Sequence, residues 1–421
     1  MTVAPSRRPW LVDALLYGIA AAFAGVAAAA ADIPLQRSWG RMTLWPYGVA
    51  AVLAVCAPWL HGDEARQRRR RIWLVVVVFL ATAIVPLVAG SARRSEGDPG
   101  DHAQSEVIIV EEAANASLGG QDPYAVEYRN GPLSDRPLAT QVHFPYLPGM
   151  LVFGLPRALA GHVAWADARV WFSIVALTVA AAGLRRMDTA PDAKVRTFQV
   201  LFALPTGALL LATGGVDIPV VALLLVTFAL AQRGGSAAAG LSGGLALAMK
   251  QTSILVLPFL VAAIPPGPER RRFVMTAGLV AVTLTVPFAL WDWGAFIEDT
   301  VLFPLGLGHG ASAAATPTIG SLLLDRFPSQ HDPITVLLVA VIAVVTCLLL
   351  FRGRTASMSQ ACARAAAAFL TAVALAPAAR VGYLVYPVNL IVWAIAFRRR
   401  DEHAVLEANP GAPPLAPVPD T

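Results

Sequence analysis

Apolar runs long enough to cross a bilayer recur along this chain from Trp10 to Phe397, and short breaks rich in charge, proline or glycine separate them. A helix needs roughly 20 apolar residues to span the hydrocarbon core. Hydrophobic residues make up 57% of the 421 positions and charged residues only 14%, which is too apolar for an ordinary soluble domain. The sequence therefore predicts an all-α polytopic membrane protein, located in the cell membrane.

Clusters of arginine predict which ends of the helices face the cytoplasm, because short loops rich in Lys and Arg stay on that side. The clusters lie at residues 7–8, 66–71, 185–196, 270–272, 352–354 and 398–400. Placing them all in the cytoplasm fits spanning helices at residues 10–31, 42–60, 72–90, 169–184, 195–213, 215–231, 273–290, 333–351, 358–377 and 382–397. The net charge of +5 then reflects topology and lipid contact, not nucleic acid binding.

Two apolar stretches do not fit as simple spans. Residues 144–159 contain three prolines and predict a re-entrant or broken element. Residues 240–264 are flanked by basic segments on both sides, which predicts two half-helices that enter and return with Lys250 near the tip. With these stretches we expect about 10–13 transmembrane helices in a single domain, residues 1–400. Residues 401–421 are rich in proline and predict a disordered cytoplasmic tail.

Two outward-facing segments are long enough to carry a site, residues 91–143 and 291–330. The first holds nine acidic residues and four arginines in a chain that is otherwise basic. A helix is expected there, lying at the membrane surface with Glu106 on its less polar face and Glu111 and Glu112 toward water. A partly desolvated carboxylate suits proton abstraction. The alternative is that Glu106 only marks an imperfect amphipathic helix.

Charged residues in or beside the apolar runs are further candidates. Lys250 interrupts an apolar stretch, where a charge costs on the order of 2.5–3.5 kcal/mol, and its ammonium suits phosphate binding; the alternative is snorkelling to the surface. Asp217 lies at the outer end of one predicted helix and suits sugar hydroxyls. Arg380, with Tyr383, lies at the outer end of another and suits a phosphate or sugar. For both sites the alternative is interfacial anchoring.

Several motifs in the first outer segment and beyond it resemble those of a known family. An acidic residue followed by AANASLGGQDPY and VHFPYLPGM resembles the first outer loop of GT-C glycosyltransferases, especially the bacterial mannosyltransferase-like (GT87-like) family that uses polyprenyl-phosphate sugars. Glu106 lies sixteen residues before Asp122, as the acid of that family does. The stretch GLSGGLALAMKQTSILVLPFL resembles its Gly-rich, Lys-containing element.

Two positions depart from the family pattern. The acid is glutamate where aspartate is usual, and Tyr146 stands at the second proline of the Y-P-P-like segment. The first departure leaves other acids of the loop as reserve candidates for the base, namely Glu112, Glu111, Asp101 and Asp98.

The resemblance implies a GT-C-like bundle with its active site on the extracytoplasmic side. Glu106 would deprotonate an acceptor hydroxyl, and the sugar, mannose by resemblance, would move with inversion from a polyprenyl phosphate to a glycolipid or glycan. Lys250 and Arg380 would bind the donor phosphate. Sugar or acceptor contacts would come from Asp122, Tyr124, His143, Tyr146, Asp217 and Tyr383. No cofactor and no metal site is expected, although a divalent metal stays possible because several acids share one loop.

Two other functions fit the same features. A transporter or lipid flippase also places charged residues in broken helices, although the expected paired repeats are not visible in the sequence. A non-catalytic partner protein would keep the fold while the acid has lost its role.

Overall fold

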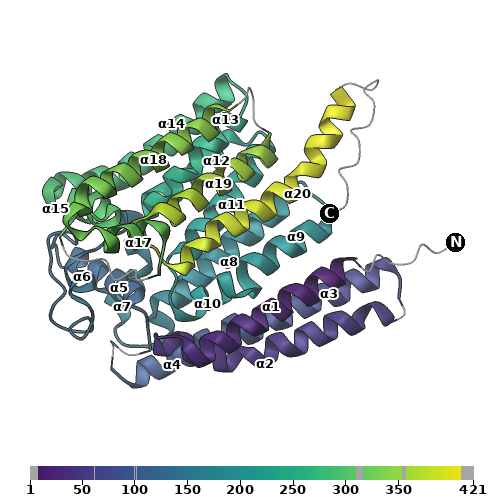
Figure 1. Cartoon of the computed structure of the whole chain (residues 1–421), viewed down its shortest axis with the longest axis horizontal. Coiled ribbons are helices and arrows are strands. Elements are labelled where there is room, and N and C mark those ends of the chain that lie inside the picture. Colours follow the sequence, from purple (N-terminus) through teal and green to yellow (C-terminus); the bar gives the residue numbers. More distant parts are fainter. Residues whose placement is uncertain are drawn as a thin grey trace.

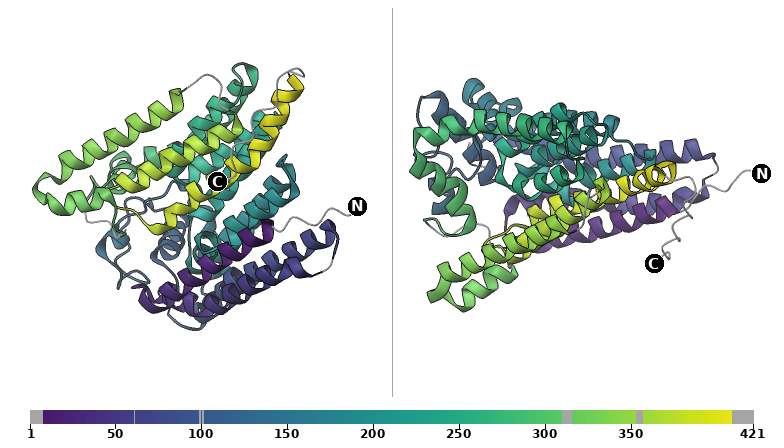
Figure 2. Two further views of the ribbon diagram at one scale, coloured as in Figure 1. Left: turned by 45° about the vertical axis from the view of Figure 1, so that its right-hand side comes forward. Right: turned by 90° about the horizontal axis from the view of Figure 1, so that it is seen from above.

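The computed structural model describes residues 8–60, 62–98, 100, 102–309, 316–352 and 357–408, with side chains up to residue 398 in the last helix. These residues form an elongated bundle of helices (Figures 1 and 2). The extended backbone pairing found within the described ranges is one isolated bridge between Thr316 and Ala379. The predicted all-α membrane fold is confirmed.

The helices follow one another along the chain with short connections. In order they are α1 (Arg8–Ala30), α2 (Pro34–Cys56), α3 (Glu64–Phe79), α4 (Val85–Glu96), α5 (Ser105–Leu118), α6 (Leu138–Val142), α7 (Leu155–Ala160), α8 (Ala168–Arg186), α9 (Pro191–Phe198), α10 (Pro205–Thr213), α11 (Asp217–Gln232), α12 (Ser236–Met249), α13 (Leu257–Ala263), α14 (Pro268–Trp291), α15 (Trp293–Ile297), α16 (Phe303–Leu305), α17 (Ile319–Arg326), α18 (His331–Phe351), α19 (Met358–Leu375) and α20 (Val385–Ala408).

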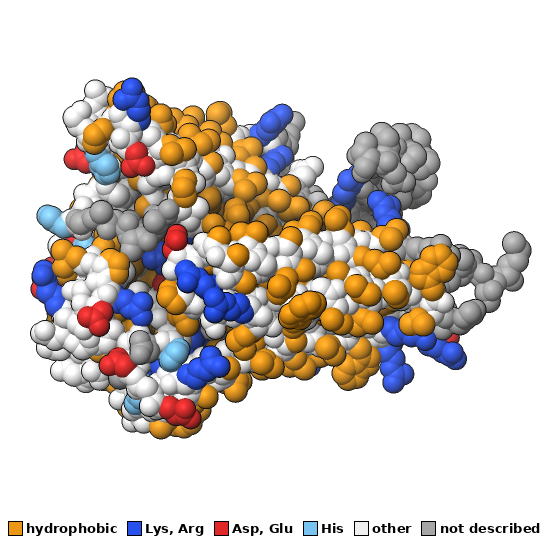
Figure 3. Space-filling view, turned by 60° about the horizontal axis from the view of Figure 1, so that its bottom comes forward, with side chains coloured by type: hydrophobic (Ala, Val, Ile, Leu, Met, Phe, Trp, Pro, Cys, Tyr) orange, Lys and Arg blue, Asp and Glu red, His pale blue; other side chains and the backbone are white. Residues whose placement is uncertain are grey.

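Eight helices within the described ranges are long and apolar enough to cross a membrane, or nine if residues 191–203 and α10, bent by 41°, form one span. α3 and α4 join through a π-helical turn into one helix of 33 residues. Apolar side chains cover the flank of the bundle, whereas charged side chains gather toward its ends (Figure 3). α11 is shorter because it runs through the interior, where nearly all its residues are buried.

The two ends of the bundle differ in composition. One end carries the connections 97–167, 292–330 and 376–384, and we call it the loop end; it lies at the left of Figure 1. The opposite end carries the basic residues at the start of α3 and α14 and at the ends of α8 and α18. The runs of neighbouring arginines at these four helix ends therefore lie at one end of the bundle, as the sequence predicts.

Both stretches that the sequence predicts to be broken are broken. Residues 144–159 form only a 3₁₀ turn, η3 (Pro148–Phe153), and α7, because prolines interrupt the backbone hydrogen bonds. α12 ends before Lys250, whose backbone is extended with φ −154° and ψ 133°. The chain continues as η6 (Gln251–Leu255) and α13, so Lys250 lies between two half-helices.

Two boundaries differ from the sequence prediction. The second helix begins at Pro34, earlier than residue 42, because its polar first turns lie at the loop end, where Arg37 donates hydrogen bonds to the carbonyl of Ala31. α20 continues through Ala408, so the start of the predicted tail is helical. Residues 409–421 lie outside the described residues.

The expected helix in the first outer segment forms as α5, but other elements enclose it. Of its fourteen residues, only Asn115 and Leu118 are exposed. It packs against η3, α7 and α8. The expectation of one face in water is therefore wrong, because periodicity shows which residues share a face but not what covers that face.

A glycine allows α5 to be covered so closely. A Cβ on Gly154, at the end of η3, would lie 2.2 Å from the carbonyl oxygen of Val110 and 2.6 Å from the Cβ of Ala114. The first of these atoms belongs to the helix backbone, which cannot move aside without breaking the helix. Gly154 is thus required for the contact between the two segments.

We expect Gly154→Ala to lower the free energy of unfolding by about 1–3 kcal/mol, because overpacking forces the backbones apart. Gly18→Ala is the matched control, since a Cβ at Gly18 would meet no atom within 4 Å, and a Gly-to-Ala change inside a helix stabilises it by roughly 0.5–1 kcal/mol. Urea unfolding in detergent, followed by circular dichroism, measures both. Equal stability of the two variants would contradict the packing described here.

Candidate active site

The turn between α10 and α11 brings Asp217 to the loop end. After Thr213, Gly214 adopts a φ of 120°, which favours glycine. A Cβ on Gly214 would lie 2.0 Å from Cγ2 of Val107 in α5, so a side chain at this position would push the two segments apart. α11 then starts with Asp217, which is buried. The start of α5 and the carboxylate of Asp217 therefore lie in one region of the loop end.

Lys250 forms an ion pair with this carboxylate. Its Nζ lies 2.6 Å from Oδ1 of Asp217, and both side chains are buried. Burial of a single charge costs several kcal/mol, which a well-placed opposite charge offsets. Snorkelling to the surface is thus wrong for Lys250, because only 4% of the residue is exposed. Sequence analysis assigns Lys250 and Asp217 to separate substrate contacts, but in the structure they form an ion pair with each other.

Two linked hydroxyl groups extend the hydrogen bonding of Asp217. The hydroxyl of Tyr386 donates to Oδ1 of Asp217 at 2.8 Å, and Oγ1 of Thr252 donates to the hydroxyl of Tyr386 at 2.8 Å. Sequence reasoning missed both residues. Tyr386 lies one helical turn after Tyr383, and that spacing is the signal that indicates a shared face.

Two aromatic rings face the ammonium group of Lys250. Its Nζ lies 5.4 Å from the ring centroid of Tyr146 and 5.1 Å from that of Tyr383. Distances of this size allow cation–π attraction, which is stronger where water is excluded. The broken element at 144–159 and the segment before α20 therefore meet around Lys250.

Glu106 forms a second ion pair, with Arg380. The Glu106 side chain is 15% exposed and that of Arg380 is 37% exposed. Glu106 lies in the first turn of α5, where the positive end of the helix dipole adds to the guanidinium in stabilising a carboxylate. This pair is therefore partly accessible, unlike the buried pair of Asp217.

One short turn connects the two ion pairs. Arg380 directly precedes η9 (Val381–Leu384), and the backbone N–H of Tyr383 donates to its carbonyl at 2.9 Å. The turn carries Arg380 to Glu106 and Tyr383 to Lys250. We call these residues together the loop-end cluster: Glu106, Asp217, Lys250, Arg380, Tyr383 and Tyr386.

The loop-end cluster pairs each of two cations with a carboxylate. A phosphate group also suits a guanidinium and an ammonium. A phosphate that binds here would therefore compete with Glu106 and Asp217 for their cations. A carboxylate released by such an exchange is free to accept a proton.

Glu111 is not in the cluster, and the expectation that it faces water is wrong. Its residue is 2% exposed. Arg94 donates to its two carboxylate oxygens at 2.9 and 2.7 Å, and the backbone N–H of Ala168 donates at 2.9 Å. Glu111 therefore joins α5 to α4 and α8, and its oxygens are occupied by these donors.

The other reserve acids lie apart from the cluster or outside the described residues. Glu112 is half-buried, not fully in water as expected. Burial is the largest cause that raises the pKa of Glu112, and the charge of Glu111 is the second. Asp98 is exposed and accepts a hydrogen bond from the N–H of Gly100 at 2.7 Å. Asp101 lies outside the described residues.

The GGQDPY turn folds inward beneath the cluster. Oδ1 of Asp122 accepts from the N–H of Tyr124 at 3.0 Å, while Oδ2 is buried without a described partner. Burial raises the pKa of Asp122, more than the hydrogen bond from Tyr124 lowers it. The hydroxyl of Tyr124 donates to the carbonyl of Tyr146 at 2.9 Å, and its ring packs on Phe144 and Phe296. Tyr124 thus positions the backbone of Tyr146.

His143 connects the two outer segments. Its Nδ1 lies 2.6 Å from Oδ1 of Asp299, its Nε2 lies 2.7 Å from the carbonyl of His309, and its ring stacks on Phe303 with centroids 4.1 Å apart. Burial by itself would lower the pKa of His143, but the hydrogen bond to Asp299 outweighs it and the pKa is raised. Burial also raises the pKa of Asp299, more than His143 lowers it. His143 is therefore buried, and both of its ring nitrogens have partners within the protein.

In the part of the chain that the structure describes, no three His, Cys, Asp or Glu side chains are placed to hold a metal ion.

We expect Glu111→Gln to lower the free energy of unfolding by about 3–5 kcal/mol, because it removes one partner of a buried ion pair. Glu106→Gln makes the same change in the same helix at a partly exposed pair and should cost about 0–1 kcal/mol. Urea unfolding in detergent compares the two variants. Similar losses would show that the difference in burial does not matter.

The raised pKa of His143 predicts its titration. The stabilisation by protonated His143 is present below the ordinary value of about 6.5 and is lost as the pH rises through the higher value of the folded protein. NMR titration of ring carbons should therefore give a pKa above about 6.5 for His143, and a lower value in Asp299→Asn, which lacks the paired charge. His143→Gln assigns the signal. A pKa that does not change in Asp299→Asn would contradict the pairing.

Comparison with known proteins identifies the family of this chain. The family model for glycosyltransferase family 87 matches residues 144–387, which is more than half of the chain. The match includes Asp217, Lys250 and Arg380, and it begins after Glu106. No curated protein matches the chain. A glycosyltransferase family argues against the transporter and flippase alternatives. The chain belongs to glycosyltransferase family 87.

Proposed function

We propose that this membrane glycosyltransferase transfers mannose from a polyprenyl phosphate to a hydroxyl of a glycolipid or glycan. The observation that carries the proposal is the loop-end cluster, in which a partly exposed carboxylate, Glu106, pairs with Arg380, and a second cation, Lys250, pairs with Asp217. A polyprenyl-phosphate sugar needs a base for the acceptor and positive charge for the departing phosphate. The carboxylate and the two cations of the cluster suit these two tasks.

The loop end would face outward from the cytoplasm. The runs of arginine at the opposite end support this orientation, because short basic loops stay on the cytoplasmic side. The donor would then enter from the outer leaflet, with its prenyl chain in the bilayer and its sugar at the loop end. The acceptor would approach from the same side.

In the proposed reaction, Glu106 accepts the proton of the acceptor hydroxyl. The hydroxyl oxygen attacks the anomeric carbon as the bond from that carbon to the phosphate oxygen breaks, and the electron pair of this bond leaves with the polyprenyl phosphate. The configuration at the anomeric carbon inverts. Arg380 and Lys250 stabilise the negative charge that grows on the phosphate. Because the donor carries its own activated sugar, this reaction needs no further cofactor.

The pairing of Glu106 with Arg380 also makes the base depend on the donor. While the guanidinium holds the carboxylate, the oxygen that Arg380 contacts is occupied. A donor phosphate that binds Arg380 releases Glu106 at the moment when an acceptor hydroxyl is to be activated. The accessible position of the pair supports this exchange, since 37% of the Arg380 side chain is exposed.

The sugar would lie against groups of the cluster and groups beside it. Tyr383 and Tyr146 offer aromatic faces beside Lys250. Asp122 and Asp217 offer carboxylate oxygens, and those of Asp217 are already bonded to Lys250 and Tyr386. We propose that Tyr383 and Asp122 contact the sugar or the acceptor, and that Asp217 acts by positioning Lys250.

We expect Glu106→Gln to reduce the rate of transfer by at least about 100-fold, because general base catalysis contributes about 10²–10⁴. The measurement uses purified protein in lipid vesicles, radiolabelled polyprenyl-phosphate mannose and a membrane glycolipid extract. Donor binding should persist in the variant. Glu127→Gln is the control, since Glu127 forms an exposed ion pair with Arg129 away from the cluster.

Two results would overturn parts of the proposal. Unchanged transfer by Glu106→Gln would assign the base to another acid of the loop, Glu112 first. Absence of transfer by the wild-type protein from several polyprenyl-phosphate sugars would favour the non-catalytic partner.

A further inference from the structure

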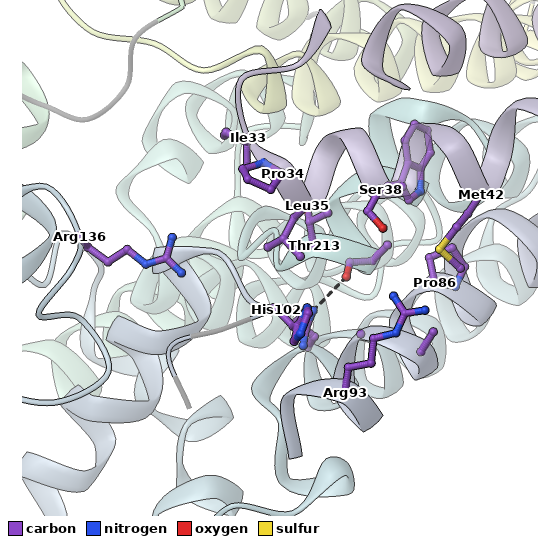
Figure 4. A pocket seen from close by; sticks show the side chains of 15 residues that line it. Ile33, Pro34, Leu35, Ser38, Met42, Pro86, Arg93, His102, Arg136 and Thr213 are labelled. Carbon is purple, nitrogen blue, oxygen red and sulfur yellow. Dashed lines mark hydrogen bonds between the residues drawn. The ribbon is translucent and has the colours of Figure 1, made fainter. Parts of the chain in front are cut away.

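A separate cavity of about 440 Å³ opens at the loop end between α2 and α4 (Figure 4). Fifteen residues from α2, α4, α8, α10 and the connections beside them line it. None of the residues of the loop-end cluster is among them. The cavity is therefore a second candidate site, independent of the one above.

The polar lining of this cavity is basic. It includes Arg93, Arg136, Arg169 and His102, and none of the fifteen lining residues is acidic. Arg169 is occupied, because Asp167 binds its guanidinium at 2.7 and 2.9 Å. Arg136 uses one nitrogen, Nη2, for the carbonyls of Gly100 and Ala103, and its other donors have no partner among the described residues.

Arg93 has no such partner. It is exposed near the end of α4, and no ion pair joins it to any residue that the structure describes. In Figure 4 its guanidinium points into the same space as Ser38 and Met42 of α2. An unpaired guanidinium in a basic cavity favours an anion with several acceptor oxygens, such as a phosphate.

The other walls are apolar and belong to helices that meet the bilayer. Leu35, Trp39 and Met42 of α2 and Pro86 of α4 line the cavity. Val85 and Val88, on the same stretch of α4, are more than half exposed, as expected of side chains that face lipid. A free anion gains nothing from such walls. A lipid tail does, because apolar surface is removed from water.

We propose that this cavity binds a membrane lipid that carries a phosphate group, with the phosphate at Arg93 and Arg136 and the hydrocarbon chain along α2 and α4. The site lies behind the start of α5. Thr213 lines it, and the N–H of Gln104, two residues before Glu106, donates to the carbonyl of Thr213 at 3.3 Å. The backbone just before α5 is thus hydrogen-bonded to a residue that lines the cavity.

A crosslinking experiment tests the proposal on the whole protein. The probe is a phosphatidic acid with a diazirine on its acyl chain, in phosphatidylcholine nanodiscs, and peptide mass spectrometry maps the labelled residues. Label is expected in residues 33–42 and 85–93. Arg93→Gln should reduce it about tenfold, as expected for loss of a hydrogen bond to a charged group. Met42→Trp, which fills the cavity, should reduce it similarly.

Two controls define the chemistry. Arg129→Gln removes an exposed arginine of the loop end that does not line the cavity, and it should leave the label unchanged. A diacylglycerol probe, which lacks the phosphate, should label these residues about tenfold less. Excess phosphatidic acid should compete with the probe, and inorganic phosphate should not.

Equal labelling of wild type and Arg93→Gln, or equal labelling by the diacylglycerol probe, would overturn the proposal. Competition by inorganic phosphate would also overturn it, in favour of a free anion. The proposal extends beyond the glycosyl transfer proposed above. The crosslinking test measures lipid binding alone. Failure of the lipid-site proposal therefore does not imply failure of the proposed glycosyl transfer, and the reverse also holds.

Discussion

A buried network of four charges holds the loop end together, and the position of the candidate base depends on it. Arg94, Glu111, Asp167 and Arg169 are each 1–2% exposed. Burial by itself would raise the pKa of Asp167, but the hydrogen bonds and charge of Arg169 outweigh it and lower the pKa to about 2. Asp167 is therefore ionised at neutral pH. Because a buried charge without its partner is costly, α4, α5 and α8 keep one arrangement, and that arrangement sets the direction of the first turn of α5.

The ion pairs of this protein differ in burial. This difference distinguishes pairs that stabilise the fold from pairs that suit catalysis. Glu111 and Arg94 are sealed from water, so their pairing is permanent. Glu106 and Arg380 are partly exposed, so their pair is accessible from outside the bundle. Lys250 and Asp217 lie between these extremes: they are buried, but they are surrounded by the aromatic rings and hydroxyls that border the cluster. A lipid phosphate would meet the accessible pair first.

Much of the architecture follows from local chemistry that a sequence contains. Apolar length predicts the spans, arginine clusters predict a basic end, and prolines predict the broken element at residues 144–159. The break at Lys250 is predicted because residues 240–264 have basic segments on both sides and are too few to cross the membrane twice. Charged residues inside apolar stretches are costly enough to mark sites, and Lys250, Asp217, Arg380 and Tyr383 do lie together. Tyr386 was missed because tyrosine at a helix start is also common at membrane interfaces.

The sequence by itself determined that this chain is a helical membrane protein of a recognisable glycosyltransferase type, since the length of apolar runs and short motifs are properties of neighbouring residues. Only the tertiary structure decided which acids are available. Glu106 and Glu111 lie in one helix and both carry a carboxylate, yet α4 and α8 cover Glu111, while Glu106 meets Arg380, which lies 274 positions further along the chain. Periodicity assigns a residue to a face of a helix. Burial and pairing depend on the distant segments that pack against that face, and these are specified only when the whole bundle has formed.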